Sequence, residues 1–298
     1  MAFPSIAAFA RLANGNAGAV RRIAGQSTRI TRASHDVTYE PVHDEIMVAN
    51  ANAQAVVTFR GGANGDEPPL RLIQGPHTQL VRPHTVAVDE QNDEIVVGDS
   101  SGRSLLAFPL DANGDVAPKR VIQGPKTGLL FVVGVAVDPV HARIVAASTS
   151  SVPGGRTGLF IFKRTDQGDV MPQAVIAGPH TGIVRPWQLA MDAVKGRIFV
   201  AAINNENHPP YELERPRNRL PPGTDIPSPW QTGALGFIGL WDINDNGDVP
   251  PRAVIKGSNT FLVHPAGVTY DPKHGEVFAT DSVRNGLFSF LARFLFPE

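Results

Sequence analysis

The sequence predicts an all-β protein built from repeated four-stranded units, and three observations support this. A turn sequence recurs five times at intervals of about 50 residues, with a longer interval before the last copy. A glycine follows each copy eleven positions later, and short apolar or alternating segments fill the stretches between copies. The copies begin at Asn14, Asn64, Asn113, Gln167 and Asn246, and the closing glycines are Gly25, Gly75, Gly124, Gly178 and Gly257.

The stretch from Pro83 to Gly124 is the clearest copy of the unit. Its Asn113-Gly114 pair favours a hairpin turn, because Asn and Gly both tolerate positive φ. A single sheet of about four strands cannot bury both of its faces, so the units must stack on one another. We therefore predict a β-propeller with five blades, since five innermost strands can be counted, and six blades is the second hypothesis. The strands expected in this copy are Thr85–Asp89, Glu94–Asp99, Ser104–Leu110 and Lys119–Gln123.

The two ends of the chain are expected to close the ring by pairing N-terminal with C-terminal strands. Ser5–Leu12 and Ala19–Ala24 have the pattern of the third and fourth strands of a blade, whereas the last units supply a first, second and third strand. This count leaves one strand in excess. We expect one terminal segment, either Ala2–Leu12 or Leu287–Phe296, to pack outside its own blade or to insert into a neighbouring subunit, with a five-stranded last blade as the alternative.

An aromatic residue precedes each turn by five positions, and Phe290 has the same place in a sixth copy that lacks the turn. We expect these residues to form the apolar core between blades, where burial of each contributes about 2 kcal/mol. The other members of the set are Phe9, Phe59, Phe108, Phe162 and Trp241.

The pattern VAVD…EIVVGDS…LLAF resembles the NHL repeat, and the resemblance spans nearly the whole chain. It implies a β-propeller, but the family includes RNA-binding modules, sensor domains, lyases and interaction scaffolds, so it does not choose a function. Asn50, Asp99 and Asp281 match the acidic residue that ends the second strand of that repeat. We interpret them as turn-capping residues rather than ligands, and Ser148 and Ile203 depart from the pattern.

Composition argues against several classes of function. The net charge is −1 and the pI is about 6.8, so we expect neither nucleic acid as a partner nor insertion into a membrane. The chain has no cysteine, which excludes disulfides and thiol catalysis. Residues 1–298 are expected to form a single domain. The start lacks the features of a signal peptide, so we expect a cytoplasmic protein as written, or an extracellular or periplasmic one if the chain is a processed form.

A long insertion, residues 204–233, separates the second and third strands of the fourth unit. It is rich in proline, has no clear period and is far longer than the corresponding loops of the other units, which favours a role in binding. It lies on the face of the disc that also carries the links between blades, where we place the function. The candidate partner-binding residues in it are His208, Tyr211, Arg215, Arg217, Arg219 and Trp230.

The links between blades bring polar and aromatic residues to the mouth of the central channel, just before each innermost strand. We expect them to border one pocket for an anionic or planar ligand; the alternative is that they simply face solvent. The candidate residues, called the channel mouth below, are His35, Arg82, His84, Arg185, Trp187 and His264.

No metal or other cofactor is expected. A divalent metal held by His35, His84 and His264 is the less favoured alternative, because no carboxylate or thiolate completes the set. No nucleophile elbow, phosphate loop or zinc-protease motif is present. The sequence therefore favours a non-catalytic recognition or assembly scaffold. Its expected partner is another protein or a second copy of the chain, with a small molecule as a further option. The alternative function is a lyase or lactone hydrolase acting at the channel mouth.

Overall fold

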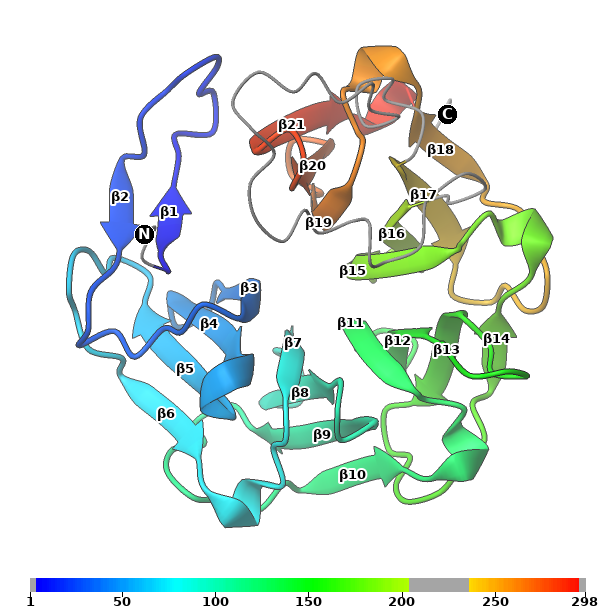
Figure 1. The fold of residues 1–298 in the computed structure, drawn as a ribbon, viewed down its shortest axis with the longest axis horizontal. Helices are drawn as coiled ribbons and strands as arrows, with labels where there is room; N and C mark the ends of the chain where they lie inside the picture. Colours follow the sequence, from blue (N-terminus) through cyan, green and yellow to red (C-terminus); the bar gives the residue numbers. More distant parts are fainter. Residues whose placement is uncertain (1–3, 204–235, 295–298) are drawn as a thin grey trace, which may run out of the picture.

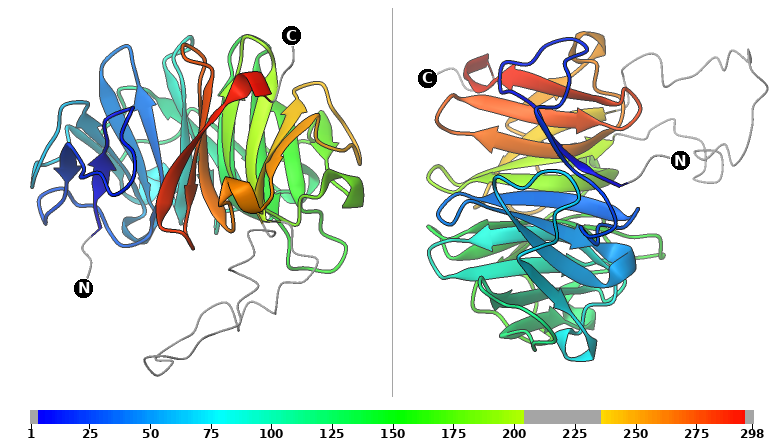
Figure 2. Two further views of the ribbon diagram at one scale, coloured as in Figure 1. Left: turned by 90° about the horizontal axis from the view of Figure 1, so that it is seen from above. Right: turned by 90° about the vertical axis from the view of Figure 1, so that its left-hand side faces the viewer.

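The computed structural model describes residues 4–203 and 236–294. The sheets stand around a central axis like the blades of a propeller (Figure 1), and edge-on views show them forming a disc (Figure 2). Within these residues there is no α-helix, and the short helical turns are all 3-10. The five predicted blades are confirmed, since five sheets place their first strand nearest the axis.

The strands of each blade run antiparallel, in sequence order from the axis outward. Blade 1 consists of β3 (Ser34–Glu40), β4 (Glu45–Asn50), β5 (Ala55–Arg60) and β6 (Arg71–Gln74). Blade 2 consists of β7 (Pro83–Asp89), β8 (Glu94–Asp99), β9 (Ser104–Pro109) and β10 (Arg120–Gln123). Blade 3 consists of β11 (Phe131–Asp138), β12 (Arg143–Thr149), β13 (Gly158–Lys163) and β14 (Ala174–Ile176).

Blade 4 consists of β15 (Arg185–Asp192), β16 (Arg197–Ile203), β17 (Gly236–Asp242) and β18 (Ala253–Lys256). Blade 5 has three strands, β19 (Pro265–Asp271), β20 (Glu276–Asp281) and β21 (Gly286–Leu291). The 3-10 turns are η1 (Ala51–Ala53), η2 (Pro76–Thr78), η3 (Pro125–Thr127), η4 (Pro179–Thr181), η6 (Ser258–Thr260) and η7 (Ala292–Phe294).

The ends of the chain meet differently from the expectation. β1 (Ile6–Ala8) and β2 (Arg21–Ile23) pair with each other in a separate two-stranded sheet, called the N-terminal hairpin below. Neither strand pairs with blade 5, so the predicted pairing of N- and C-terminal strands does not form among the described residues. An ion pair between Arg11 and Glu276, 2.9 Å from nitrogen to oxygen, instead connects the hairpin loop to the start of β20.

The aromatic residues behave as expected in the complete blades. Phe59, Phe108, Phe162 and Trp241 are fully buried in the clusters between neighbouring blades. Phe290 is partly buried in the cluster between blades 4 and 5. The expectation was wrong for Phe9, which is exposed, because among the described residues no inner strand pairs with β1 and blade 5 has no fourth strand.

The repeated turn joins each of blades 1 to 4 to the unit before it. In blade 2, Asp115 of the turn accepts a hydrogen bond from the backbone N–H of His77, at 2.7 Å, in the link that leaves blade 1. Its side chain fills the space beside Gly75, where a Cβ atom would lie 2.3 Å from the Asp115 Cγ. Gly75 has φ of +135°, which side chains disfavour. The same arrangement joins Asp66 to Gly25, Asp169 to Gly124 and Asp248 to Gly178.

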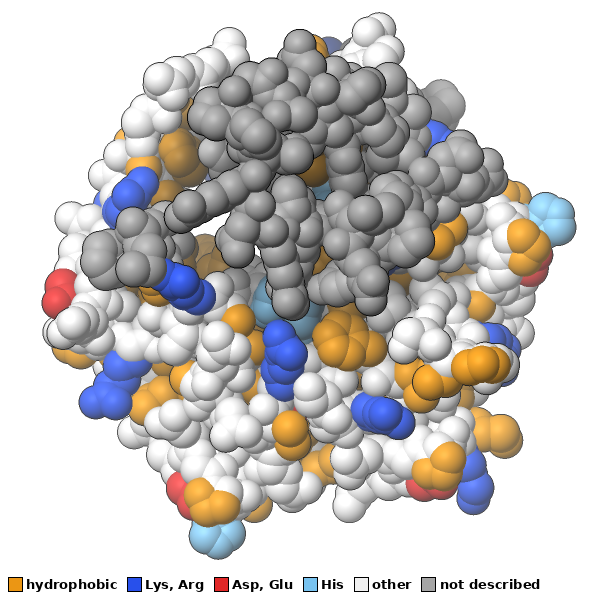
Figure 3. Space-filling model, in the orientation of Figure 1, with side chains coloured by type: hydrophobic (Ala, Val, Ile, Leu, Met, Phe, Trp, Pro, Cys, Tyr) orange, Lys and Arg blue, Asp and Glu red, His pale blue; other side chains and the backbone are white. Residues whose placement is uncertain are grey.

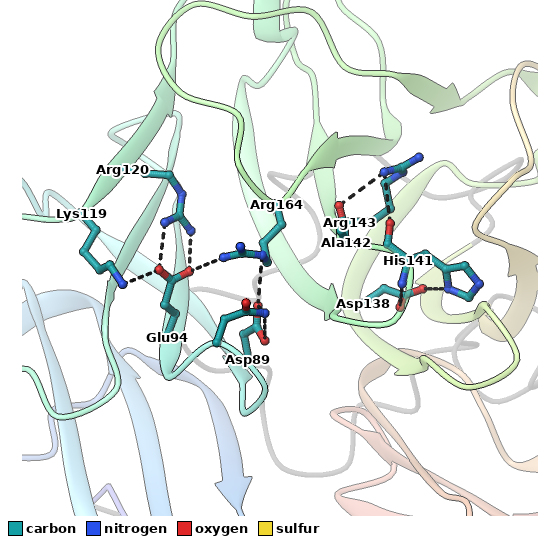
Figure 4. A network of polar contacts seen from close by, with 10 residues as sticks. Asp89, Glu94, Lys119, Arg120, Asp138, His141, Ala142, Arg143 and Arg164 are labelled. Atoms are coloured by element: carbon teal, nitrogen blue, oxygen red, sulfur yellow. Dashed lines mark hydrogen bonds and ion pairs between the residues drawn. The ribbon is translucent and has the colours of Figure 1, made fainter.

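Buried ion pairs reinforce this contact on the opposite face of the disc. Glu94 accepts hydrogen bonds from Arg120 and Lys119 of its own blade and from Arg164 of blade 3 (Figure 4). Arg164 also lies 4.0 Å from Asp89, so one guanidinium bridges two blades. Hydrogen bonds from Arg120 and Lys119, opposed by burial, lower the pKa of Glu94 to about 2.

We predict that Gly75→Ala destabilises the protein by about 3 kcal/mol and Gly257→Ala by about 1–2 kcal/mol. Both glycines have positive φ, but nothing lies within 4 Å of the Cβ position at Gly257, whereas Asp115 occupies it at Gly75. Denaturant unfolding of both variants measures the difference. Equal losses would show that backbone strain alone acts and that the contact with Asp115 contributes nothing.

We predict that Glu94→Gln lowers the free energy of unfolding by about 2–3 kcal/mol at neutral pH. The folded-state pKa of Glu94 lies below its unfolded value of 4.5, so its contribution is full above pH 4.5 and is lost as the pH falls toward 2. Unfolding curves of the wild type and the variant should therefore converge across that window. A difference that stays constant down to pH 2 would contradict the assignment.

Candidate functional site

The channel mouth is built by an irregularity that recurs at the start of every innermost strand. Pairing between the first two strands of each blade shifts just after the first residues, so that residues at this point are left without a ladder partner. The residues so displaced include His35, His84, Val133, Trp187 and Ala266. Three residues of this aligned column, His35, His84 and Trp187, come together although they belong to different blades.

The structure brings four of the predicted residues together. The imidazole rings of His35 and His84 stack with centroids 4.2 Å apart, and Trp187 lies 6.0 Å from His84. His264 follows at 5.6 Å from Trp187. Figure 3 shows this face of the disc, with histidine at its centre beside hydrophobic and basic side chains. The result is a row of aromatic rings across the mouth.

The two stacked histidines are neutral at physiological pH. Burial, the neighbouring His35 and the Arg82 charge lower the pKa of His84 to about 3, against one favourable hydrogen bond to Val133. Burial and the charge of Arg82 also lower the pKa of His35. His84 Nδ1 lies 3.0 Å from the Val133 carbonyl oxygen, so in the neutral ring Nδ1 carries the proton and Nε2 is an acceptor.

A polar layer closes the channel beneath the rings. The Thr85 hydroxyl donates to Asp36 at 2.7 Å and accepts from the Val135 N–H at 3.1 Å, which joins blades 1, 2 and 3. Gln188 of blade 4 donates to the His35 carbonyl at 3.2 Å, across the axis. Asp36 retains some exposed surface as a residue, but its carboxyl group is enclosed, and this burial raises its pKa. The row of rings is called the bowl below, and the hydrogen-bonded layer of Thr85, Asp36 and Gln188 is called its floor.

One donor in the bowl lacks a partner among the described residues. The Trp187 indole N–H is buried and makes no hydrogen bond to residues 4–203 or 236–294, a state that costs free energy unless an acceptor is supplied. Together, the bowl contains the donor of Trp187, the acceptor of the buried His84, and the exposed residue His35, whose ring stacks on His84. These suit a planar or apolar group that carries one polar atom.

A cavity of about 560 Å³ lies beside the bowl on the same face, and the sequence did not predict it. Phe131 connects the two, because it lines the cavity and its ring lies 6.1 Å from His84. Arg185 also lines the cavity, whereas Arg82 acts on the histidines of the bowl. The described lining mixes polar and apolar side chains. Its apolar members are Leu130, Phe131, Val152 and Val184, and its hydroxyl and guanidinium groups come from Ser100, Ser101, Arg103, Thr149, Ser150, Ser151, Thr157 and Arg185.

A sequence signal for this cavity existed. The loop between the second and third strands of blade 3 is five residues longer than its counterparts in blades 1, 2 and 5, and residues 149–157 of it form one wall. A second cavity of about 530 Å³ lies on the opposite face, beside the ion pair of Glu45 and Arg71. Residues of the turns between first and second strands, including His43 and Asn92, line it.

The remaining sequence predictions have mixed outcomes. Asp99 and Asp281 do cap the links between blades: Asp99 accepts from the backbone N–H groups of Val81 and Arg82, and Asp281 from those of Val263 and His264. Ser148 uses its hydroxyl in the same way. The candidate residues of the insertion lie outside the described residues: His208, Tyr211, Arg215, Arg217, Arg219 and Trp230.

Within residues 4–203 and 236–294, no group of three or more His, Asp or Glu side chains is placed to hold a metal ion. His264 approaches Trp187 rather than the stacked pair of histidines, so the three histidines form a row and not a ligand set. In the same part of the chain, no helix is long and apolar enough to cross a bilayer.

We predict that His84 stays neutral in the folded protein down to about pH 4, as its lowered pKa requires. The unfolded chain binds this proton near pH 6.5, so the residue lowers stability as the pH falls from 6.5 toward 3. NMR titration of the imidazole carbons tests this, with His84→Asn assigning the signal and denatured protein as the reference. A folded-state midpoint near 6.5 would contradict the geometry.

Comparison with known proteins supports the fold. No known family model matches the chain, and no curated protein sequence matches it, so the resemblance to the NHL repeat stays a prediction. A solved structure entitled "Crystal structure of Nidogen/Laminin Complex" superimposes with a TM-score of 0.57 at 12% identity. The match covers 87% of this chain and 76% of the other. The chain is therefore similar in fold to a β-propeller found in a protein complex.

Proposed function

We propose that the protein is a non-catalytic recognition module that binds a segment of another protein across the bowl and the adjoining cavity. The observation that carries this proposal is their continuity through Phe131, which joins an aromatic bowl to a cavity of about 560 Å³. A small ligand fills a few hundred Å³, whereas a peptide can occupy both parts at once.

The chemistry of the two parts indicates what the segment carries. Arg103 and Arg185 stand among hydroxyl groups, and no carboxylate is found in the described lining of the cavity, which suits a carboxylate of the partner. The bowl suits an apolar or aromatic side chain that covers the rings and offers an acceptor to Trp187. The similar structure, by its title a complex of nidogen with laminin, is consistent with this mode.

The alternative, a lyase or lactone hydrolase at the channel mouth, requires a metal or a nucleophile near the histidines. Its sharpest test is the metal content of the purified protein: one divalent ion per chain that His84→Asn and His35→Asn abolish would favour the enzyme over the recognition module.

Selection from a displayed library of random peptides tests the proposal. We expect the wild type to enrich peptides that combine an acidic with an aromatic or aliphatic residue, and Phe131→Ala or Arg103→Glu to weaken binding of those peptides about tenfold or more. Lys273→Glu, the same kind of charge reversal in an exposed turn of the opposite face, is the matched control. No enrichment, or equal loss in the control, would overturn the proposal.

A further inference from the structure

The N-terminal hairpin is the outer half of a blade. Ile23 forms a parallel bridge with Gly65 of blade 1, and the same bridge recurs as Ile73 with Gly114, Ile122 with Gly168 and Ile176 with Gly247. In those other cases the first residue belongs to the fourth strand of a blade and the glycine to the turn of the next. β1 and β2 therefore occupy the third and fourth strand positions of a unit that precedes blade 1 (Figure 1).

The inner half of this unit is missing from the described residues. β1 pairs with β2 on one side and with no described strand on the other, so its second backbone edge is unpaired in residues 4–203 and 236–294. In blades 1 to 4 the third strand always pairs with a second strand on that side.

The neighbouring surfaces show what the missing half would cover. Val37 and Tyr39 of β3 are 52% and 55% exposed, whereas Val86, which has the register of Val37 in blade 2, is 2% exposed. Val86 packs against Met47, Ala49 and Val56 of the preceding blade. Val37 and Tyr39 face the place where the corresponding strands would lie, and none of the strands that the structure describes occupies it.

The surface on the other side of the same place is equally apolar. Leu287 of β21 is 53% exposed, whereas Leu105, in the same register of blade 2, is 2% exposed within the cluster shared with blade 3. Phe9, at the end of β1, is 46% exposed although its counterparts in complete blades are fully buried. β3 and β21 thus present apolar side chains toward one position that no described strand occupies, and the exposed Phe9 belongs to the incomplete unit itself.

We propose that this position, called the half-blade site, binds a β-hairpin from another polypeptide. Its occupant is defined by the complete blades: two antiparallel strands with apolar side chains on both faces, one of which pairs with the open edge of β1. β7 and β8, residues 83–99, are such a hairpin. A second copy of this chain is not the expected occupant, since each first and second strand in its described residues already pairs within its own blade.

A synthetic peptide of residues 83–99 with a fluorescent label is the probe. We expect fluorescence anisotropy to report binding to the full-length protein, and the melting temperature to rise with peptide concentration. A peptide of scrambled sequence should do neither. Val37→Asp should weaken binding about tenfold or more, because the charge would be buried under the hairpin.

Two further variants keep the test decisive. Val254→Asp places the same charge at an exposed position on β18, away from the half-blade site, and should bind the peptide like the wild type. Leu287→Asp places a charge on β21, on the other side of the half-blade site. It should weaken binding of the peptide as much as Val37→Asp does, so the test remains valid if one of the two variants does not fold.

The proposal is overturned if the wild type does not bind the peptide, or if Val37→Asp and Leu287→Asp, both folded, bind it unchanged. Light scattering measures the oligomeric state of the wild type and of Val37→Asp, which tests whether a second copy of the chain occupies the site. A wild-type dimer that Val37→Asp converts to a monomer would assign the half-blade site to a second copy of the chain and would also overturn the proposal of a separate partner.

Discussion

The contact between a turn aspartate and the closing glycine of the preceding blade is the constraint on which the rest of the ring depends. The carboxylate of Asp115 takes one backbone N–H of the link and occupies the side-chain space of Gly75. Because the glycine has positive φ and no Cβ, the two backbones approach more closely than any other residue would allow. Four repetitions of this contact set the spacing and rotation between successive sheets, and the apolar clusters then fill the space that remains.

The geometry of the channel mouth depends on how these contacts orient the blades. Once the blades are oriented, the bulge at the start of each innermost strand turns one side chain toward the axis, and His35 can stack on His84 although 49 residues of sequence separate them. The floor depends on the same placement, since Thr85, Asp36 and Gln188 come from three blades. Desolvation by this environment keeps both imidazoles neutral, which leaves hydrogen bonding and stacking as the chemistry of the bowl.

The sequence was sufficient for the parts that repeat and insufficient for those that do not. Five innermost strands, four buried aromatics and the aligned column of the channel mouth follow from period and register alone, because neighbours within a blade are close in sequence. The contact of Asp115 with Gly75 and His77 could not be predicted, since these residues leave the preceding blade and the turn has the sequence of an ordinary hairpin. The cavity next to Phe131 depends on loops of three blades. The prediction that Phe9 is buried was wrong, because a repeat pattern does not reveal that the strands beside it are absent from the described residues.

The contacts between successive blades are not all equal, as Gly257 shows. It has positive φ like the other closing glycines, yet no aspartate fills its side-chain space, because the described residues of blade 5 contain no fourth strand and no repeated turn. Blades 4 and 5 are held by the packing of residues such as Leu240, Leu262 and Val277. The blades thus form a linear array in which the contact between blades 4 and 5 is weaker than the others, rather than a uniform ring. Local opening should begin at blade 5 and spread inward, so amide hydrogens there exchange first while those of blades 2 and 3 persist.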